Sequence, residues 1–200
     1  SGATSSNSGS IAGQVSINII GSITEASVLG GSSLTARDIT IKAIEKSSIL
    51  AISGALAYGG KAGVGASVAW NQIKSTDPDD TDAPGAVIAS IQNSDVDLSG
   101  SLSLTADSNN RILAVTAAVG ASSDEGLALA ATVSMNTINV DTHAYIIGKK
   151  TLGIDVDGAI TINAYNRSSI LSIAGGLSFS KKASIGVAGS YNEISGTLKA

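Results

Sequence analysis

The densest group of chemically active side chains in this sequence is the acidic segment "STDPDDTDAPG" at residues 75–85. It carries four carboxylates, on Asp77, Asp79, Asp80 and Asp82. Carboxylate oxygens packed this closely are the ligands that Ca²⁺ prefers. The segment lacks the glycine and terminal glutamate of an EF-hand loop and does not match the nonapeptide calcium repeat. It is therefore either a calcium-binding loop or a solvated acidic loop, and no other cofactor is indicated.

The single histidine lies close to an acid in "VDTHAYII". Asp141 and His143 share a face if this segment is a strand, because side chains two apart point the same way. Nucleophilic catalysis also needs an activated hydroxyl, and no "GxSxG" elbow occurs in the chain. We therefore predict no catalytic residue here and expect His143 to be an ordinary residue of an exposed strand or loop.

Two further pairs of acids, Asp95 with Asp97 and Asp155 with Asp157, have the same spacing. Glycoside cleavage needs two carboxyl groups that face each other across a groove. The corresponding segment near the N-terminus, "SVLGGSS", has no acid at all. These four residues are predicted to lie at solvated turn edges.

Asparagine recurs in matching contexts about 53–65 residues apart, in "SINII", "AWNQI", "SMNTI" and "SYNEI". The residues are Asn18, Asn71, Asn136 and Asn192. Stacked repeats place such residues in register, where buried amides form a ladder that satisfies each donor and acceptor. The alternative is a turn-forming asparagine at the end of each strand.

The asparagines belong to a repeat that covers the whole chain. Ile39–Ile73 superimposes on Ile160–Ile194 without a gap and with almost half of the residues identical, and Leu102–Ile138 aligns with a two-residue insertion. We expect one continuous array, a fragment of a longer chain. Its predicted divisions are a partial repeat at 1–18, repeat 1 at 19–71, repeat 2 at 72–136 with the insertion 75–85, repeat 3 at 137–192, and the start of a fourth at 193–200.

Within each repeat the apolar residues alternate with period two, which predicts strands. In the first copy, large residues form one face and small residues the other: Leu50, Ile52, Leu56 and Tyr58 against Ala51, Ser53, Ala55 and Ala57. A Gly-rich turn follows, and alternation resumes with Val64, Ala66, Val68 and Trp70 against Gly63, Gly65, Ser67 and Ala69. A shorter strand precedes this pair at 39–43, 102–106 and 160–164.

These faces lead to two expectations about packing. The large face is predicted to be core. The small face is predicted to be buried against a closely approaching sheet or neighbouring chain, because it carries no charge, and the alternative is that it lies at a tolerant, solvent-facing surface. The connection between the two long strands is either a hairpin or an arch between layers.

Composition excludes several classes of protein. Apolar residues make up 43% of the chain, aromatic residues 3% and charged residues 14%, with a net charge of −4 and no cysteine. This leaves no basic face for nucleic acid, no disulfide framework and no run long enough for a transmembrane helix. The chain begins without a visible signal peptide.

Two segments, "GVGASVAWNQI" and "AVIASIQNSDVDLSGSLSLTADSNN", resemble repeats of giant bacterial extracellular adhesins. The similarity is to the leukotoxin-type filamentous adhesins and, more loosely, to filamentous-haemagglutinin-like exoproteins. It implies a long β-solenoid outside a bacterial cell. The family's carbohydrate-dependent secretion domain has no counterpart in this sequence, so the secretion route stays open.

We therefore expect an all-β fold, a repetitive parallel β-helix-like solenoid or a layered strand stack. The expected function is a non-catalytic structural segment of a secreted or cell-surface bacterial fibre or adhesin that self-associates along or between chains. One alternative is an adhesive module that binds glycan or a host-surface protein, with calcium in the acidic loop. Another is a β-helical polysaccharide-active enzyme, although the 12 basic residues are scattered.

Overall fold

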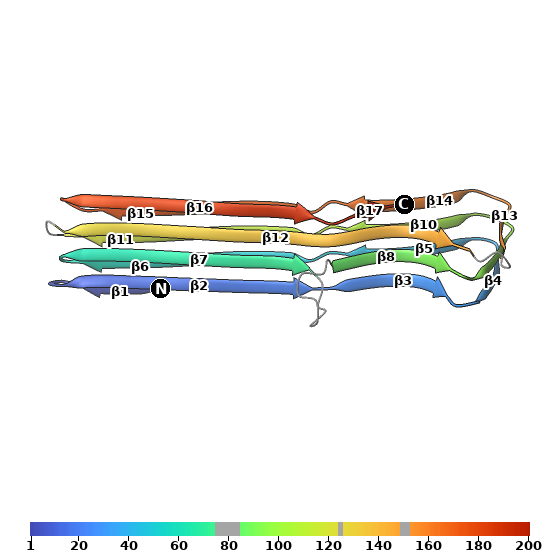
Figure 1. Cartoon of the computed structure of the whole chain (residues 1–200), viewed down its shortest axis with the longest axis horizontal. Helices are drawn as coiled ribbons and strands as arrows, with labels where there is room; N and C mark the ends of the chain where they lie inside the picture. Colours follow the sequence, from blue (N-terminus) through green and yellow to red (C-terminus); the bar gives the residue numbers. More distant parts are fainter. Residues whose placement is uncertain (75–84, 124–125, 149–152) are drawn as a thin grey trace.

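The computed structural model describes residues 1–74, 85–123, 126–148 and 153–200. In these residues every element is a β-strand and every strand pair is parallel, which confirms the predicted all-β, solenoid-like fold. Figure 1 shows the chain as coils stacked in rows, with long strands at one end and shorter ones at the other.

Each coil runs once around the solenoid. After β1 (Gly2–Ser5), the first coil contains β2 (Gly9–Gly21), β3 (Ile23–Leu29), β4 (Ser33–Ala36), β5 (Ile39–Glu45) and β6 (Ser48–Gly59). The second contains β7 (Ala62–Lys74), β8 (Gly85–Gln92), β9 (Asp95–Leu98), β10 (Leu102–Ser108) and β11 (Arg111–Ser122). The third contains β12 (Leu127–Ile147), β13 (Ile154–Val156), β14 (Ile160–Asn166) and β15 (Ser169–Phe179), and the fourth begins with β16 (Ala183–Ser195) and β17 (Leu198–Lys199).

Equivalent strands of successive coils pair without a slip. β6 pairs with β11 and β11 with β15, so that Leu50, Leu113 and Leu171 stand in one column. The short strands predicted at 39–43, 102–106 and 160–164 are β5, β10 and β14, also in register. The long β12 pairs with β7 along its first half and with β8 along its second.

The two long strands of a coil are joined by an arch and not by a hairpin. β6 lies in the sheet β1–β6–β11–β15, whereas β7 lies in a different sheet with β2, β12 and β16. The two strands contact each other through side chains, because neither is the other's hydrogen-bonded neighbour. We call the first layer the β6 layer and the second, made of β2, β7, β16 and Leu127–Ile138 of β12, the β7 layer. Together the two layers form the arm.

The remaining strands enclose a wider compartment, which we call the body. Its core consists of large aliphatic residues that are fully buried, among them Ile91, Leu98, Leu102 and Leu104, and Ile138 at the base of the arm packs into the same core. At the corner between β8 and β9 the chain needs a left-handed residue, and Asn93 supplies it with φ 52°. Gly30, with φ 72°, occupies the same place in the first coil, as expected for a conformation that few residue types adopt readily.

The arm is packed in the opposite way to the sequence prediction. Its interior is built from small residues, and Ala51, Ala55 and Ala57 are at most 5% exposed. The large face of the same strand points outward, with Leu50 65% and Ile52 70% exposed. The expectation that the large face is core is therefore wrong for the arm, whereas the expected burial of the small face is confirmed and occurs within one chain.

Close approach of the two layers explains this inversion. A Cβ atom added at Gly65 would lie 2.5 Å from the carbonyl oxygen of Val119, and one at Gly120 would overlap the carbonyl oxygen of Leu129. Two layers so close have no space for Leu or Ile between them, so the larger side chains occupy the outer faces. Inward residue size thus sets the width of the solenoid, which is narrow in the arm and wide in the body.

Candidate functional site

The most regular polar feature of the structure is a column of four asparagines in the β7 layer. Asn18 Nδ2 donates to Asn71 Oδ1, Asn71 Nδ2 to Asn136 Oδ1, and Asn136 Nδ2 to Asn192 Oδ1, each over 2.8 Å. Asn71 and Asn136 are completely buried. The residues singled out in the sequence thus form a continuous hydrogen-bonded ladder.

In the first, third and fourth coils a serine two positions earlier accepts a further hydrogen bond from the asparagine amide. Asn136 Nδ2 also donates to Ser134 Oγ over 3.0 Å, and Asn192 Nδ2 donates to Ser190 Oγ over 3.2 Å. A buried amide whose donors and acceptor are satisfied costs little, but one displaced by a register slip would lose these partners. Because a slip of one residue turns each asparagine to the outer face, the ladder favours a single register.

The ladder lies where the arm joins the body. Asn71 is two residues from Ile73, which is fully buried in the body core, and the interior of the arm towards its tip contains alanine, glycine and serine. Across the arm interior, Ser53 and Ser67 share a hydrogen bond, and Ser172 Oγ donates to Ser134 Oγ over 3.0 Å. Hydroxyl pairs therefore also join the two layers.

Asp141 and His143 lie on one face of β12, as their spacing predicts, and both contact Thr197. Thr197 Oγ1 donates to Asp141 Oδ1 over 2.8 Å, and its backbone N–H donates to the same oxygen over 2.6 Å. The single hydroxyl hydrogen is therefore directed at Asp141, so His143 Nε2, 2.7 Å away, is the donor to Thr197 Oγ1. This order differs from a catalytic triad, in which the acid orients the imidazole and the imidazole accepts the hydroxyl proton.

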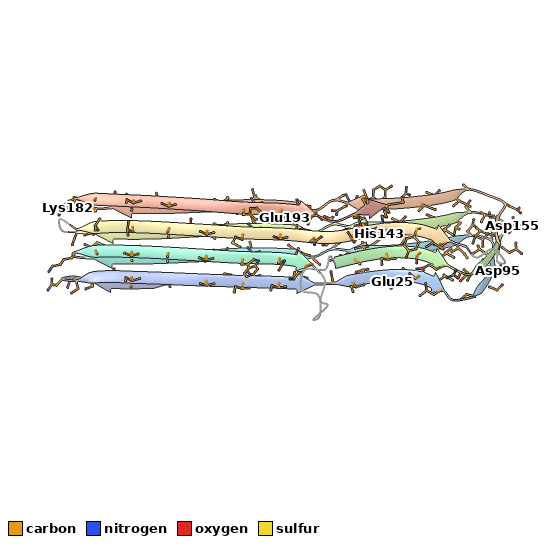
Figure 2. The ribbon with its side chains drawn as sticks, viewed as in Figure 1. Glu25, Asp95, His143, Asp155, Lys182 and Glu193 are labelled. Carbon is orange, nitrogen blue, oxygen red and sulfur yellow. The ribbon has the colours of Figure 1, made fainter. Side chains whose placement is uncertain are left out.

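The acids at the far end of the body sit on neighbouring coils. Asp97 is the register partner of Asp155, and Asp95 Oδ1 accepts a hydrogen bond from the backbone N–H of Gly153 over 2.6 Å. Figure 2 places Asp95 and Asp155 at the end of the molecule opposite the arm tip. Asp157 follows β13 in the same turn region. Among the described residues no group of three or more His, Cys, Asp or Glu side chains is arranged to hold a metal ion.

The acidic segment is placed only in part. Asp77, Asp79, Asp80 and Asp82 lie outside the described residues, so the calcium hypothesis stays a prediction. The segment connects β7 to β8, and in the next coil β12 runs through the corresponding position as one continuous strand.

The sequence alone does not predict the two exposed outer faces of the arm, because large apolar residues are ordinarily expected in the core. In the β6 layer Leu56 and Leu177 are at least half exposed. In the β7 layer Trp70 and Met135 are about two-fifths exposed although other coils pair with their strands on both sides. The glycines of the small face are the signal that indicates this orientation. Large residues alternate with these glycines along the strand, so they point outward when the glycines point inward.

One ionisable group on the outer arm has a shifted pKa. Tyr191 donates its hydroxyl to Glu193 Oε2 over 2.8 Å, and this hydrogen bond, together with the negative charge of Glu193, raises the pKa of Tyr191 above its ordinary value. The bond's stabilising contribution is therefore present below the tyrosine pKa of the unfolded chain and is lost as pH rises through the higher folded pKa.

We predict that Glu193→Gln lowers the pH at which Tyr191 ionises, because the substitution removes the negative charge while leaving an amide oxygen as acceptor. The near-ultraviolet absorbance of tyrosinate, followed as a function of pH, measures this ionisation. The variant Tyr191→Phe identifies the contribution of Tyr191 to the absorbance. Glu25→Gln, which makes the same change of net charge on β3, is the control and should leave the titration unchanged. An unaltered Tyr191 titration in Glu193→Gln would contradict the assigned cause.

Comparison with protein-family models, with curated proteins and with solved structures finds no match to this chain. In the described part of the chain no helix has the length and apolar character needed to cross a membrane.

Proposed function

We propose that this chain is a non-catalytic structural segment of an extended β-solenoid fibre, secreted from or displayed on a bacterial cell. The observation that carries the proposal is the exact register of the coils. The segments between equivalent asparagines differ in length, at 53, 65 and 56 residues, and yet every described strand meets its counterpart in the same alignment. Length differences are confined to connections, as expected when the stack itself is the functional unit.

The mechanical consequence follows from this stacking. Each coil is held by parallel backbone hydrogen bonds, by the asparagine ladder and by burial of the body core, and it shares all three with its neighbours. Stability of such a stack is approximately a sum of intrinsic and nearest-neighbour contributions, so a longer stack resists local opening better. The bacterial and extracellular setting, and the adhesin role within it, are supported by the resemblance of the repeats.

We expect that one additional coil can be built into the stack. A second copy of residues 127–182, inserted after Lys182, would start at the position paired with Leu127 and return the chain to Ala183 in register. The particle should lengthen along the stack by about 4.8 Å, the spacing of paired strands, and should need more urea to unfold. Small-angle X-ray scattering and urea denaturation followed by circular dichroism measure these two effects.

The control is an insertion of the same 56 residues in scrambled order, which adds equal length without the repeat pattern. It should form a loop or destabilise the chain. If the repeated coil behaves like the scrambled one, the stack has a fixed number of coils and the fibre proposal is wrong.

A further inference from the structure

The outer face of the β7 layer is a continuous apolar surface. Val68, Trp70, Val133 and Met135 lie in the second and third coils, where other coils pair with their strands on both sides, and they still expose 36–43% of their areas. Ile17 and Tyr191 extend the same row into the first and fourth coils. Monomeric proteins rarely leave a patch of this kind uncovered.

Charged residues border this face but do not enter it. The segments 11–17, 64–70, 129–135 and 185–191 contain no Asp, Glu, Lys or Arg. Lys61 and Lys182 lie at the arm tip and Glu193 at its base, and Figure 2 labels Lys182 and Glu193 at these two places. An apolar centre with a polar rim is the typical arrangement of a protein–protein interface.

The relief of the face is regular over the first three coils. In the first three coils, columns of large residues, through Val64 and Leu129 and through Val68 and Val133, flank a column of small ones that includes Gly13 and Ala131. In the fourth coil the sizes are exchanged, because Val187 continues the small column and Gly189 continues a large one. A Cβ atom added at Gly13 would meet nothing within 4 Å, so packing inside the chain does not require glycine there. The small column forms a shallow furrow between two ridges.

The occupant that fits this relief is a second copy of the same face. Side chains along each ridge repeat at the spacing of paired strands, about 4.8 Å, so ridges and furrows of two copies can match over the first three coils, whereas an unrelated globular surface has no such period. Four strands over about 30 Å give a face of roughly 600 Å², so a pair of copies would bury about 1,200 Å². That total reaches the lower end of the range for specific interfaces, and each further coil would add to it.

We infer that two copies of this chain associate face to face through the outer surface of the β7 layer, as a two-fold symmetric pair. This inference rests on the proposed structural function and deepens it, because it identifies the surface by which one stack binds another laterally. Its test is independent of coil addition: a chain that accepts an extra coil and stays monomeric would overturn the pairing and leave the fibre segment intact.

The first experiment is sedimentation equilibrium of the whole chain over a hundredfold range of concentration. The wild-type chain should pass from monomer to dimer, and the double variant Val68→Lys/Val133→Lys should need at least tenfold higher concentration to do so. The matched control, Ile52→Lys/Val115→Lys, places two lysines on the outer face of the β6 layer and should dimerise like the wild type. A monomeric wild type, or an effect only in the control variant, would overturn the inference.

A second experiment does not require lysine to be tolerated in a strand. The chain has no cysteine, so a single Ala131→Cys in the furrow provides one thiol at the centre of the face. Mild oxidation of dilute protein should give a disulfide-linked dimer much faster than with Ala117→Cys on the opposite outer face. Equal rates of disulfide formation would contradict pairing through the β7 layer. Binding of the monomer to phosphatidylcholine vesicles, if the substitutions Val68→Lys/Val133→Lys abolish it, would also contradict the pairing, because it would assign the face to a lipid surface.

Discussion

Gly120→Ala should lower the free energy of unfolding by about 3 kcal/mol or more, a large effect for the addition of one methyl group. Gly120 lies in β11 and faces the β7 layer, where its missing Cβ would overlap the carbonyl oxygen of Leu129 and approach that of Gly63. Both obstacles are backbone atoms of paired strands, so the methyl group is accommodated only if the two layers of the arm separate. Urea denaturation followed by far-ultraviolet circular dichroism measures the loss.

Two adjacent glycines in β15 provide the matched control. A Cβ atom at Gly176 would lie 2.9 Å from the carbonyl oxygen of Val187, whereas one at Gly175 would meet nothing within 4 Å. Gly176→Ala should therefore destabilise the chain, and Gly175→Ala should be neutral or slightly stabilising, because alanine reduces the conformational freedom of the unfolded chain. Equal effects of Gly175→Ala and Gly176→Ala would mean that the arm interior is not tightly packed.

The sequence was sufficient to predict the repeat and its register. Four asparagines in the same local context, together with the gapless superposition of Ile39–Ile73 on Ile160–Ile194, fixed which residues stand in one column, and the structure pairs those residues. Period-two alternation identified the strands for the same reason, because a strand exposes alternate residues to opposite faces.

The sequence predicts that large and small residues alternate along the arm strands, but it does not predict which of the two faces points inward. Leu50 and Ile52 were assigned to the core because apolar residues are usually buried, but that rule runs one way only, since folded proteins still expose much apolar area. The small size of the residues on the other face decides which face points inward. Gly63 and Gly65 permit a backbone approach that no larger residue allows, and this approach gives more contact than a wide layer with gaps.

The arch was undetermined for a different reason. A Gly-rich connection such as Gly59–Lys61 is compatible with a hairpin or with an arch, and the choice depends on whether the hydrogen-bonding partners of β6 are β7 or the strands of other coils. Those partners lie tens of residues away in sequence. The contact of Thr197 with Asp141 and His143 could not be predicted from the sequence for the same reason, because it joins two different coils.

Asn136→Asp is expected to destabilise the chain by about 3 kcal/mol or more at neutral pH and to cost much less in acid. The substitution keeps the shape of the side chain, and a carboxylate can still accept from Asn71 Nδ2 and from the hydroxyl of Ser134. It cannot donate to Asn192 Oδ1, which would then face a second acceptor, and it buries a negative charge at a fully buried position.

The pH dependence distinguishes this cause from a general packing defect. Burial and the facing oxygen raise the folded-state pKa of the introduced carboxyl group above its unfolded value of about 3.9. The stability of the variant relative to the wild type should therefore be nearly restored below about pH 3.9, fall as pH rises towards the folded pKa, and stay constant above it. The protonated carboxyl group is again a donor, so the hydrogen bond to Asn192 can re-form in acid.

Asn192→Asp is the matched control on the same column. Asn192 is exposed, accepts from Asn136 Nδ2 and contacts the hydroxyl of Ser190, and a carboxylate can accept from both. Its cost should be small and nearly independent of pH, as measured by urea denaturation between pH 3 and pH 8. A pH-independent loss in Asn136→Asp, or equal losses in the two variants, would contradict burial of an unpaired negative charge in the ladder as the cause.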